Sequence, residues 1–277
     1  MNVIIRKGRS AARRLGVLSK RWSRRPLRAI LSPFEPGMGR PLLVHCGHHK
    51  IGTLWFHNVL RAVSDEFGLR YQKDKQPALR PDTDVFHQSH SNFSFSGLAD
   101  YRGSHIIRDL RDVVISGYFY HLWTPEEWAH RREDRWRGMT YQELLRSVDQ
   151  EAGLHIEIDR FVEMNLRNFT DWNYDDPNII EVRYEDLLAD EAGGFRRIFE
   201  KYGFRDDAVE KAVAIALDFT FSRVSKRQVG SVKQGDHLRS GRPGEWRTLF
   251  DDKHREHFKE RVGQALIQLR YADDLDW

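Results

Sequence analysis

Short apolar runs alternate with longer amphipathic segments from residue 41 to the end of the chain. Four of the short runs have the length and composition of buried strands, at residues 42–46, 84–88, 104–108 and 178–182. Strands separated by helices along the chain are typical of parallel sheets, because a parallel connection has room for a helix. We therefore expect an α/β fold in which helices flank both faces of a parallel β-sheet.

The longer segments carry apolar residues every three or four positions, most clearly at residues 53–67. Further helices are predicted at residues 112–123, 154–169, 193–204, 207–217 and 252–270. Another helix opens at Thr140, since Thr140 and Glu143 have the spacing of a capping box. Sheets of this kind bind ligands beyond the carboxyl ends of their strands. The segments that directly follow the strands are therefore where we expect the chemistry.

The chain has 277 residues, 40% of them hydrophobic, which is enough for one full core. We expect an N-terminal arm and linker at residues 1–40 and a single globular domain at residues 41–277. No apolar run reaches the roughly 20 residues of a membrane-spanning helix, which favours a cytoplasmic or membrane-peripheral protein. The one cysteine, Cys46, excludes an intrachain disulfide and is expected as a buried thiol.

The formal net charge of +4 averages two unlike regions. Residues 1–40 hold eleven of the 45 Lys/Arg residues and one of the 41 acidic residues, so the rest of the chain is mildly acidic. An arginine-rich arm of this kind is compatible with peripheral contact to an anionic membrane, with an organelle-targeting presequence or with nucleic-acid contact. A solvated arm without chemistry is the fourth interpretation.

The sequence HHKIGTLW at residues 48–55 has the features of an anion site directly after the first predicted strand. Gly52 permits a tight turn, Lys50 supplies a cation, and the amide and hydroxyl of Thr53 open the next helix. In the common nucleoside triphosphate loop the lysine follows the last glycine and precedes Ser/Thr. Here the lysine precedes the glycine, so the loop alone does not choose among phosphate-like ligands.

A second set of anion-binding groups occurs further along the chain. Arg108 ends a predicted strand, and Ser116 follows about two turns into the next helix. Arg239 and Gly241 lie in a turn-rich segment far downstream. Two guanidinium groups, a hydroxyl and a glycine amide can together hold a second phosphate, separate from the one at Lys50.

From about residue 41 to residue 271 the sequence resembles the sulfotransferase family, enzymes that use 3′-phosphoadenosine 5′-phosphosulfate (PAPS). HKIGTLW is similar to the family's 5′-phosphosulfate loop PKSGTTW, with Lys50, Gly52, Thr53 and Trp55 matching. Leu54 replaces the second threonine and leaves only its backbone amide for the 5′-phosphate. The resemblance implies a P-loop-like three-layer fold, PAPS as cosubstrate, no metal, and Lys50 as a catalytic cation.

The same resemblance implies a 3′-phosphate site. RDLRDVVISGYFYH keeps the family's eight-residue spacing between Arg108 and Ser116, and LRSGRPGEW is similar to the late RKG segment. Arg239 and the Gly241 amide are then expected at the 3′-phosphate. Ser240 replaces the lysine of RKG and removes one cation there.

Three aromatic residues are expected near the adenine. Tyr184 of VRYEDLL stands where the family has an adenine contact, and Trp55 and Phe221 are expected as ring neighbours of the purine. Segment 121–177, rich in Trp, Arg, Glu and Tyr, is expected to form helices over the acceptor pocket.

Transfer to a hydroxyl or amine acceptor needs a base, and histidine suits that task near neutral pH. QSH at residues 88–90 resembles the Lys-Thr-His that carries the catalytic histidine in the cytosolic branch, which implies His90 as the base. Gln88 stands at the lysine position, so a supporting cation is expected to be absent. His87 is the rival base, and a different residue or no base at all is the remaining alternative.

The expected function is transfer of a sulfuryl group from PAPS to a hydroxyl or amine of a small molecule, a lipid or a saccharide. A non-catalytic nucleotide-binding protein and an ATP-dependent P-loop kinase are the alternatives, the latter disfavoured because Ile51 follows Lys50 where a magnesium-holding Ser/Thr belongs. His45, His48 and His49 lack partners at zinc spacing, so no metal site is predicted.

Overall fold

The computed structural model describes residues 32–37, 39–236 and 239–277. Most of the basic arm at residues 1–40 lies outside the described residues, and its proposed contacts therefore stay predictions. Five strands form one parallel sheet: β1 (Leu42–Cys46), β2 (Tyr71–Lys73), β3 (Val85–Gln88), β4 (Tyr101–Ile107) and β5 (Ile179–Arg183). Their order is β2-β3-β1-β4-β5, so β1 is central and the connections leave it toward both edges. The expected α/β fold with a parallel sheet is confirmed.

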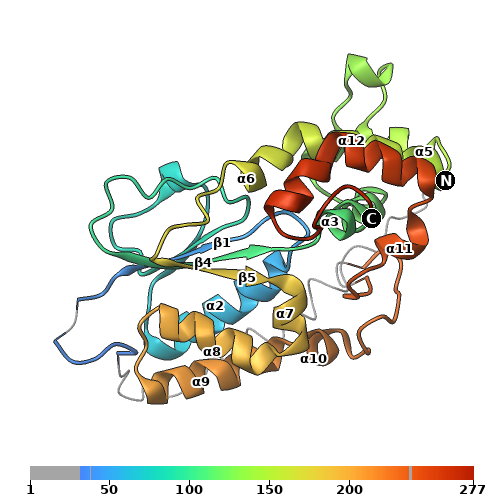
Figure 1. Ribbon diagram of the computed structural model, residues 1–277. Helices are drawn as coiled ribbons and strands as arrows, with labels where there is room; N and C mark the ends of the chain where they lie inside the picture. The colour runs from blue at the N-terminus through green and yellow to red at the C-terminus, as the bar shows by residue number, and fades with distance from the viewer. Residues whose placement is uncertain (1–31, 38, 237–238) are drawn as a thin grey trace, which may run out of the picture.

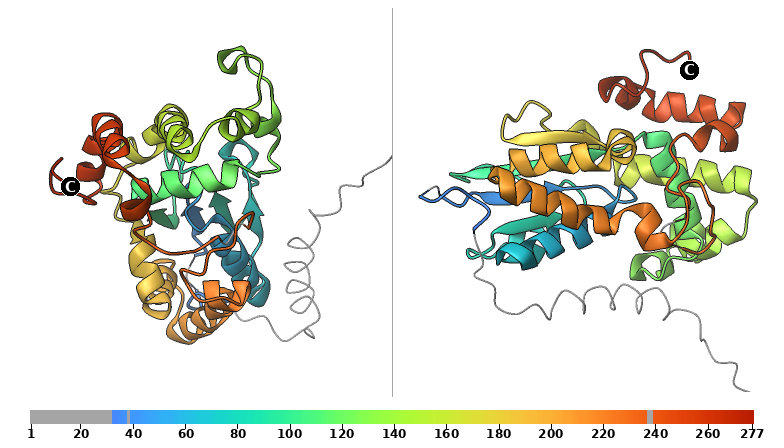
Figure 2. Two further views of the ribbon diagram at one scale, coloured as in Figure 1. Left: turned by 90° about the vertical axis from the view of Figure 1, so that its right-hand side faces the viewer. Right: turned by 90° about the horizontal axis from the view of Figure 1, so that it is seen from below.

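Helices lie on both sides of the sheet (Figures 1 and 2). One side carries α2 (Thr53–Phe67), α7 (Tyr184–Ala189), α8 (Glu191–Lys201) and α9 (Asp206–Ala216). The other side carries α3 (Leu110–His121), α4 (Tyr141–Arg146), α5 (Gln150–Met164), α6 (Leu166–Thr170) and α12 (Asp252–Gln268). Two short helices, α10 (Phe221–Ser225) and α11 (Trp246–Leu249), flank the long connection that runs beside α3 and α7.

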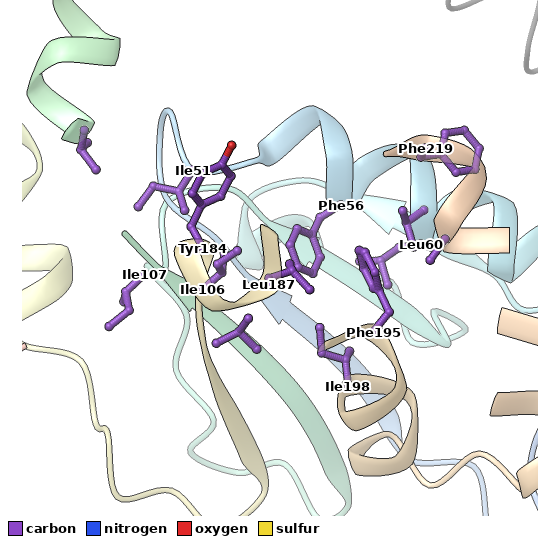
Figure 3. Packing of buried hydrophobic residues seen from close by; sticks show 14 of the residues in the cluster. Ile51, Phe56, Leu60, Ile106, Ile107, Tyr184, Leu187, Phe195, Ile198 and Phe219 are labelled. Atoms are coloured by element: carbon purple, nitrogen blue, oxygen red, sulfur yellow. The ribbon is translucent and has the colours of Figure 1, made fainter. Parts of the chain in front are cut away.

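The main core includes a layer between the sheet and the helices α2, α7 and α8. Figure 3 shows Phe56, Leu187 and Phe195 pointing toward one another in this layer, and the Phe56 and Phe195 ring centroids are 5.6 Å apart. All three side chains are buried. Each fully buried side chain of this size contributes about 1.5–3 kcal/mol to folding, so this layer fixes α2 firmly against β1.

The opposite face of β1 packs into a smaller cluster. Val44 and Cys46 meet Phe86 and Phe93 there, because neighbouring residues of a strand point to opposite faces. Cys46 is 1% exposed, and burial raises the pKa of its thiol far above the usual range. The prediction of a buried thiol is confirmed.

Several predicted boundaries were wrong. The helix expected at 112–123 begins at Leu110, because Asp109 caps it by accepting from the Arg111 amide. The single helix expected at 154–169 begins earlier, at Gln150, and is broken at Asn165, whose φ of −129° is not helical. The capping box of Thr140 and Glu143 is present as predicted.

Strand β2 and helices α7, α10 and α11 were not predicted. β2 has only three residues, two of them polar, and pairs with the edge of β3. α7 follows β5 without a turn and has no side-chain cap. Neither leaves the periodic apolar pattern from which the other elements could be predicted.

Candidate functional site

The loop after β1 presents backbone donors at the start of α2. The N-cap residue is Gly52, in the left-handed region at φ 63°, and no side chain caps the helix. The first amides of an uncapped helix lack intrahelical acceptors, and the helix dipole adds positive potential there. The hydroxyl of Thr53 donates to the His48 carbonyl at 3.1 Å, which ties the loop to the helix. The helix start therefore has the donors of an anion site.

Lys50 lies beside this helix start and also has a left-handed backbone, at φ 68°. A non-glycine residue rarely adopts that conformation, and such strain is concentrated at functional sites. The Lys50 ammonium lies 3.6 Å from the centre of the Tyr120 ring. Burial lowers the pKa of Lys50 to about 7, although the nearby Glu126 carboxylate acts in the opposite direction. The charged form therefore lacks sufficient compensation from the protein alone.

Arg108 follows β4 and is 5% exposed. Its Nη2 donates to the Arg242 carbonyl at 3.3 Å, and the guanidinium carbon lies 4.6 Å from the centre of the Tyr184 ring. Its Nε–H is buried without a hydrogen-bond partner among the described residues. An unpaired buried donor on a cation is costly, and an anion in the adjoining space would satisfy it.

The segment after α10 brings the downstream groups to the same place. Glu245 accepts hydrogen bonds from Arg239 Nη2 at 2.5 Å and from Ser240 Oγ at 2.7 Å, which holds this segment in shape. Gly241 is at φ 67°, and a Cβ there would lie 2.8 Å from the Phe221 ring. The Tyr184 hydroxyl donates to the Gly241 carbonyl at 3.2 Å. Only glycine fits this position without displacing Phe221.

A cavity of about 1160 Å³ joins these groups. Its walls include every residue that the sequence analysis placed at the nucleotide or as the first-choice base: Lys50, Gly52, Thr53, Leu54, Trp55, His90, Arg108, Ser116, Tyr184, Phe221, Arg239, Ser240 and Gly241. The two predicted anion sites, from segments far apart in the sequence, thus open into one space at the carboxyl ends of β1 and β4.

His87 does not line this cavity. Its side chain is completely buried in β3, where its Nδ1 lies 3.0 Å from the Tyr71 hydroxyl. Residue 87 belongs to the strand itself, and the chain leaves the sheet only after Gln88. The suggestion of His87 as the rival base was therefore wrong.

The supporting cation that the sequence analysis expected to be absent has a counterpart. Lys73, the last residue of β2, lines the cavity. It lies opposite His87 in the parallel pairing of β2 with β3. Burial lowers the pKa of Lys73 from its ordinary value. Because β2 was not predicted, its terminal lysine could not be placed.

Other cavity residues were also missed. His49, Tyr120, Trp123 and Glu126 all line the walls. Glu126 accepts from the Tyr120 hydroxyl at 2.8 Å and from the Trp128 indole at 2.6 Å. Segment 121–177 therefore reaches the cavity at its beginning. Most of its helices instead pack on α3 and α12.

The described part of the chain lacks two further features. Within it, no group of three or more His, Cys, Asp or Glu side chains is placed to hold a metal ion. None of its helices combines the length and the apolar character that crossing a membrane requires.

Solved structures share the fold at low sequence identity. Mouse sulfotransferase SULT7A1 complexed with PAP superimposes with a TM-score of 0.55 at 16% identity, covering 84% of this chain and 85% of that one. Retinol dehydratase in complex with androsterone and the inactive cofactor PAP gives a TM-score of 0.54 at 16% identity, covering 83% and 82%. Retinol dehydratase with retinol and PAP gives 0.55 at 16% identity, with the same coverage. These likenesses show the fold.

Sequence comparison supplies the family. No curated protein sequence matches the chain at a significant level. The family model described as "Sulfotransferase domain" matches residues 104–270, more than half of the chain. The match includes Arg108, Ser116 and Arg239, whereas the Lys50 loop precedes it and is placed beside them by the fold. The chain is a member of the sulfotransferase family.

Proposed function

We propose that this protein transfers a sulfuryl group from PAPS to a hydroxyl or amine acceptor. The observation that carries the proposal is that one cavity joins Lys50 and the start of α2 to Arg108 and Arg239. A nucleotide with phosphates at both the 3′ and 5′ positions requires two cationic sites separated by an adenosine. The kinase alternative lacks a Ser/Thr directly after Lys50.

The 5′-phosphate fits the start of α2. The amides of Thr53, Leu54 and Trp55 lie in the first turn of a helix without a side-chain cap. Leu54 takes part through its backbone, so the missing hydroxyl removes one contact and leaves the others. Lys50 adds the charge that the helix start lacks.

The 3′-phosphate fits the space between Arg108, Ser116, Arg239 and Gly241. The unpaired Nε–H of Arg108 is the donor most in need of an acceptor. Glu245 holds the Arg239 side chain in place, and its negative charge offsets part of the arginine attraction. Asp112, 3.8 Å from Arg108 Nη2, offsets that arginine in the same way.

Aromatic side chains line the same cavity as the two anion sites. Trp55 and Tyr184 have ring centroids 6.4 Å apart, and Phe221 packs over Gly241 in the same wall. The Trp55 indole N–H is buried without a hydrogen-bond partner among the described residues. These rings supply an apolar site for the adenine and one free donor for it.

Sulfuryl transfer needs positioning and charge stabilisation more than covalent help from the protein, as in phosphoryl transfer. Lys50 neutralises charge at the bridging oxygen as the bond to sulfur breaks. The acceptor must also lose a proton. His90, implied by the family resemblance, and His49 both line the cavity near Lys50, and each ring can receive that proton.

We further propose that the acceptor is a small molecule, a lipid or a saccharide with a free hydroxyl or amine. Tyr120 and Trp123 give the cavity an aromatic wall beside His49, with ring centroids 5.6 Å apart for His49 and Tyr120 and 5.0 Å apart for Tyr120 and Trp123. The retinol dehydratase structures contain androsterone or retinol, both apolar alcohols. An apolar alcohol suits an aromatic wall of this kind.

The test is a screen of radiolabelled PAPS against phenols, amines, lipid alcohols and glycans. We expect a labelled acceptor with the wild-type protein and none with Lys50→Ala. Lys253→Ala, which alters an exposed lysine of α12, is the control and should retain transfer. Tight binding of 3′-phosphoadenosine 5′-phosphate (PAP) without a labelled product in any acceptor class would favour a non-catalytic nucleotide-binding protein. Magnesium-dependent ATP turnover would favour the kinase.

A further inference from the structure

A line of three hydrogen-bonded side chains connects the interior to the cavity. The Glu157 carboxylate lies 2.8 Å from His121 Nδ1, and His121 Nε2 lies 3.2 Å from His49 Nε2. Glu157 and His121 are buried, with side-chain exposures of 4% and 1%. His49 is half-buried and lines the cavity next to Lys50. We call this arrangement the Glu157 chain.

The hydrogen bonds of the Glu157 chain fix the protonation of each ring. Because an ionised carboxylate only accepts, His121 must carry its proton on Nδ1 and present a lone pair on Nε2. His49 must then donate from Nε2. Its remaining nitrogen, Nδ1, is left with a lone pair, and Nδ1 has no hydrogen-bond partner among the described residues. A neutral histidine with a free lone pair at a cavity wall is a general base.

Helix packing holds the carboxylate at the end of this line. The Tyr141 hydroxyl donates to the same Glu157 oxygen at 2.7 Å. A Cβ at Gly117 would lie 2.6 Å from the Glu157 carboxylate, so α3 approaches α5 closely only because residue 117 is glycine. A side chain fixed by two donors and a close helix contact can orient a partner ring.

His90 lacks such support. It is exposed, and its ring makes no hydrogen bond among the described residues; only its backbone amide is bonded, to Gln88. Its ring centroid is 6.5 Å from that of His49, so both histidines border the same part of the cavity. The two rings differ in that a hydrogen bond fixes the orientation of His49 and none fixes that of His90.

The protein also contains a counterpart of the Glu157 chain that does not reach the cavity. Glu181 lies 2.6 Å from His105 Nδ1, and His105 Nε2 lies 2.8 Å from His48 Nε2. His48 is 2% exposed and stacks on Phe169 with ring centroids 3.7 Å apart. This Glu181 chain has the same groups in the same order but does not open into the large cavity. Substitutions in the Glu181 chain can therefore serve as controls for substitutions in the Glu157 chain.

We propose that His49 is the general base of the reaction and that His121 and Glu157 are its positioning residues. This rests on the sulfotransfer function proposed above. The acceptor O–H or N–H bond breaks and its proton moves to His49 Nδ1. The acceptor atom forms a bond to sulfur, and the bond from sulfur to the 5′-phosphate oxygen breaks, with the electron pair leaving on that oxygen. Glu157 stabilises the imidazolium through His121, and solvent removes the proton after product release.

The environment keeps His49 neutral before the reaction. Burial is the main reason that the pKa of His49 lies well below its usual value, and His121, Lys50, His90 and Arg160 lower it further. Burial likewise lowers the pKa of His121, although Glu157 acts against it. Both rings therefore carry lone pairs at neutral pH.

Long-range ¹H–¹⁵N NMR on the ¹⁵N-labelled full chain tests the positioning without any acceptor. We expect neutral His49 with its proton on Nε2 at about pH 7.5. Glu157→Gln should shift the His49 proton toward Nδ1, because an amide also donates and can reverse the chain. Glu181→Gln should leave the His49 signals unchanged. A His49 protonated on Nδ1 in the wild-type protein would overturn the proposal.

Turnover separates His49 from His90. With an acceptor from the PAPS screen, His49→Gln should lower kcat about 100-fold or more, and Glu157→Gln should lower kcat with KM unchanged. His90→Gln should lower kcat less than His49→Gln does, and His48→Gln should stay near the wild-type rate. Loss of turnover in His90→Gln with retention in His49→Gln would overturn the assignment. Calorimetric binding of PAP by every variant separates this failure from a failure of the sulfotransfer function, and the NMR result stands even if no acceptor is found.

Discussion

Lys50 combines two costs that a folded protein normally avoids. Its backbone is in the left-handed region, and its partly buried side chain places the ammonium 3.6 Å from the centre of the Tyr120 ring. The Glu126 carboxylate acts to raise the pKa of Lys50 but does not bring it back to the ordinary value of a lysine. Such costs are tolerated where a ligand compensates for them. At this position a bound phosphate is the natural compensation.

The depressed pKa of Lys50 predicts a pH-dependent affinity for PAP. The free protein holds this lysine with a pKa of about 7, and an adjacent phosphate raises that pKa because it favours the charged form. Between about pH 7.5 and 9.5, binding must therefore take up a proton, and affinity should fall by nearly tenfold per pH unit. Calorimetric titration with PAP across this range measures the slope.

Lys50→Arg is the matched control for this slope. A guanidinium stays charged throughout the range, so the variant should bind PAP with little pH dependence. The phosphates of PAP are already ionised above pH 7.5 and do not contribute a slope. A flat profile in the wild-type protein would contradict the account of Lys50.

Gly241 is the second cavity residue with unusual local geometry, because the Phe221 ring packs closely against it. Gly241→Ala would place a methyl group 2.8 Å from the Phe221 ring and strain a backbone at φ 67°. We expect PAP affinity to fall about tenfold or more, equivalent to about 1.4 kcal/mol, because the amide and the ring both move. Gly235→Ala is the control, since Gly235 has φ 68° but open space around its Cα. Equal losses in both variants would mean that backbone strain alone is responsible.

At the scale of elements, β4 has to approach β1 closely to place Arg108 beside the Lys50 loop. Gly103 lies in the middle of β4, opposite Val44 of β1. A Cβ at Gly103 would lie 2.7 Å from the Val44 carbonyl oxygen and 2.5 Å from the Ile179 side chain. Neither a backbone carbonyl nor a packed core side chain moves easily. The glycine is therefore needed for the central pairing of the sheet.

Gly103→Ala should lower the free energy of unfolding by about 1–3 kcal/mol, the usual cost of overpacking. Urea denaturation of the purified protein measures this difference. Gly39→Ala is the control, because the nearest atom to its Cβ would be 4.0 Å away and its φ is not positive. A Gly103→Ala protein as stable as the control would contradict the close pairing of β1 and β4.

The predictability of the elements depended on how much apolar pattern each one carries. The boundaries of α2 could be predicted because its apolar residues keep helical spacing up to Phe67 and Gly68 ends it in a left-handed conformation. β2 left no such signal, because an edge strand of three residues is held by pairing with β3. Because β2 was not predicted, the position of Lys73 at the cavity was not predicted either.

At the scale of the whole molecule, the parallel sheet brings segments that are far apart in the sequence to one cavity. Lys50 follows β1, Arg108 follows β4, and Arg239 comes from the connection between α10 and α11. Motif spacing was enough to predict these residues, because each motif is local. The Glu157 chain could not be predicted, since it depends on how α3 packs on α5 across a glycine. Local motifs thus indicated the proposed nucleotide site, while the proposed proton path required tertiary structure.

The central claim is that one cavity holds two phosphates at opposite ends of one adenosine. Calorimetric titration of the full chain with PAP and with 5′-AMP tests it most directly, because the two ligands differ only in the 3′-phosphate. Each charge-assisted hydrogen bond contributes about 1.5–3 kcal/mol, so losing two of them should weaken 5′-AMP by about 100-fold or more. Arg108→Ala should reduce most of that difference. Equal affinity for PAP and 5′-AMP in the wild-type protein would contradict the account.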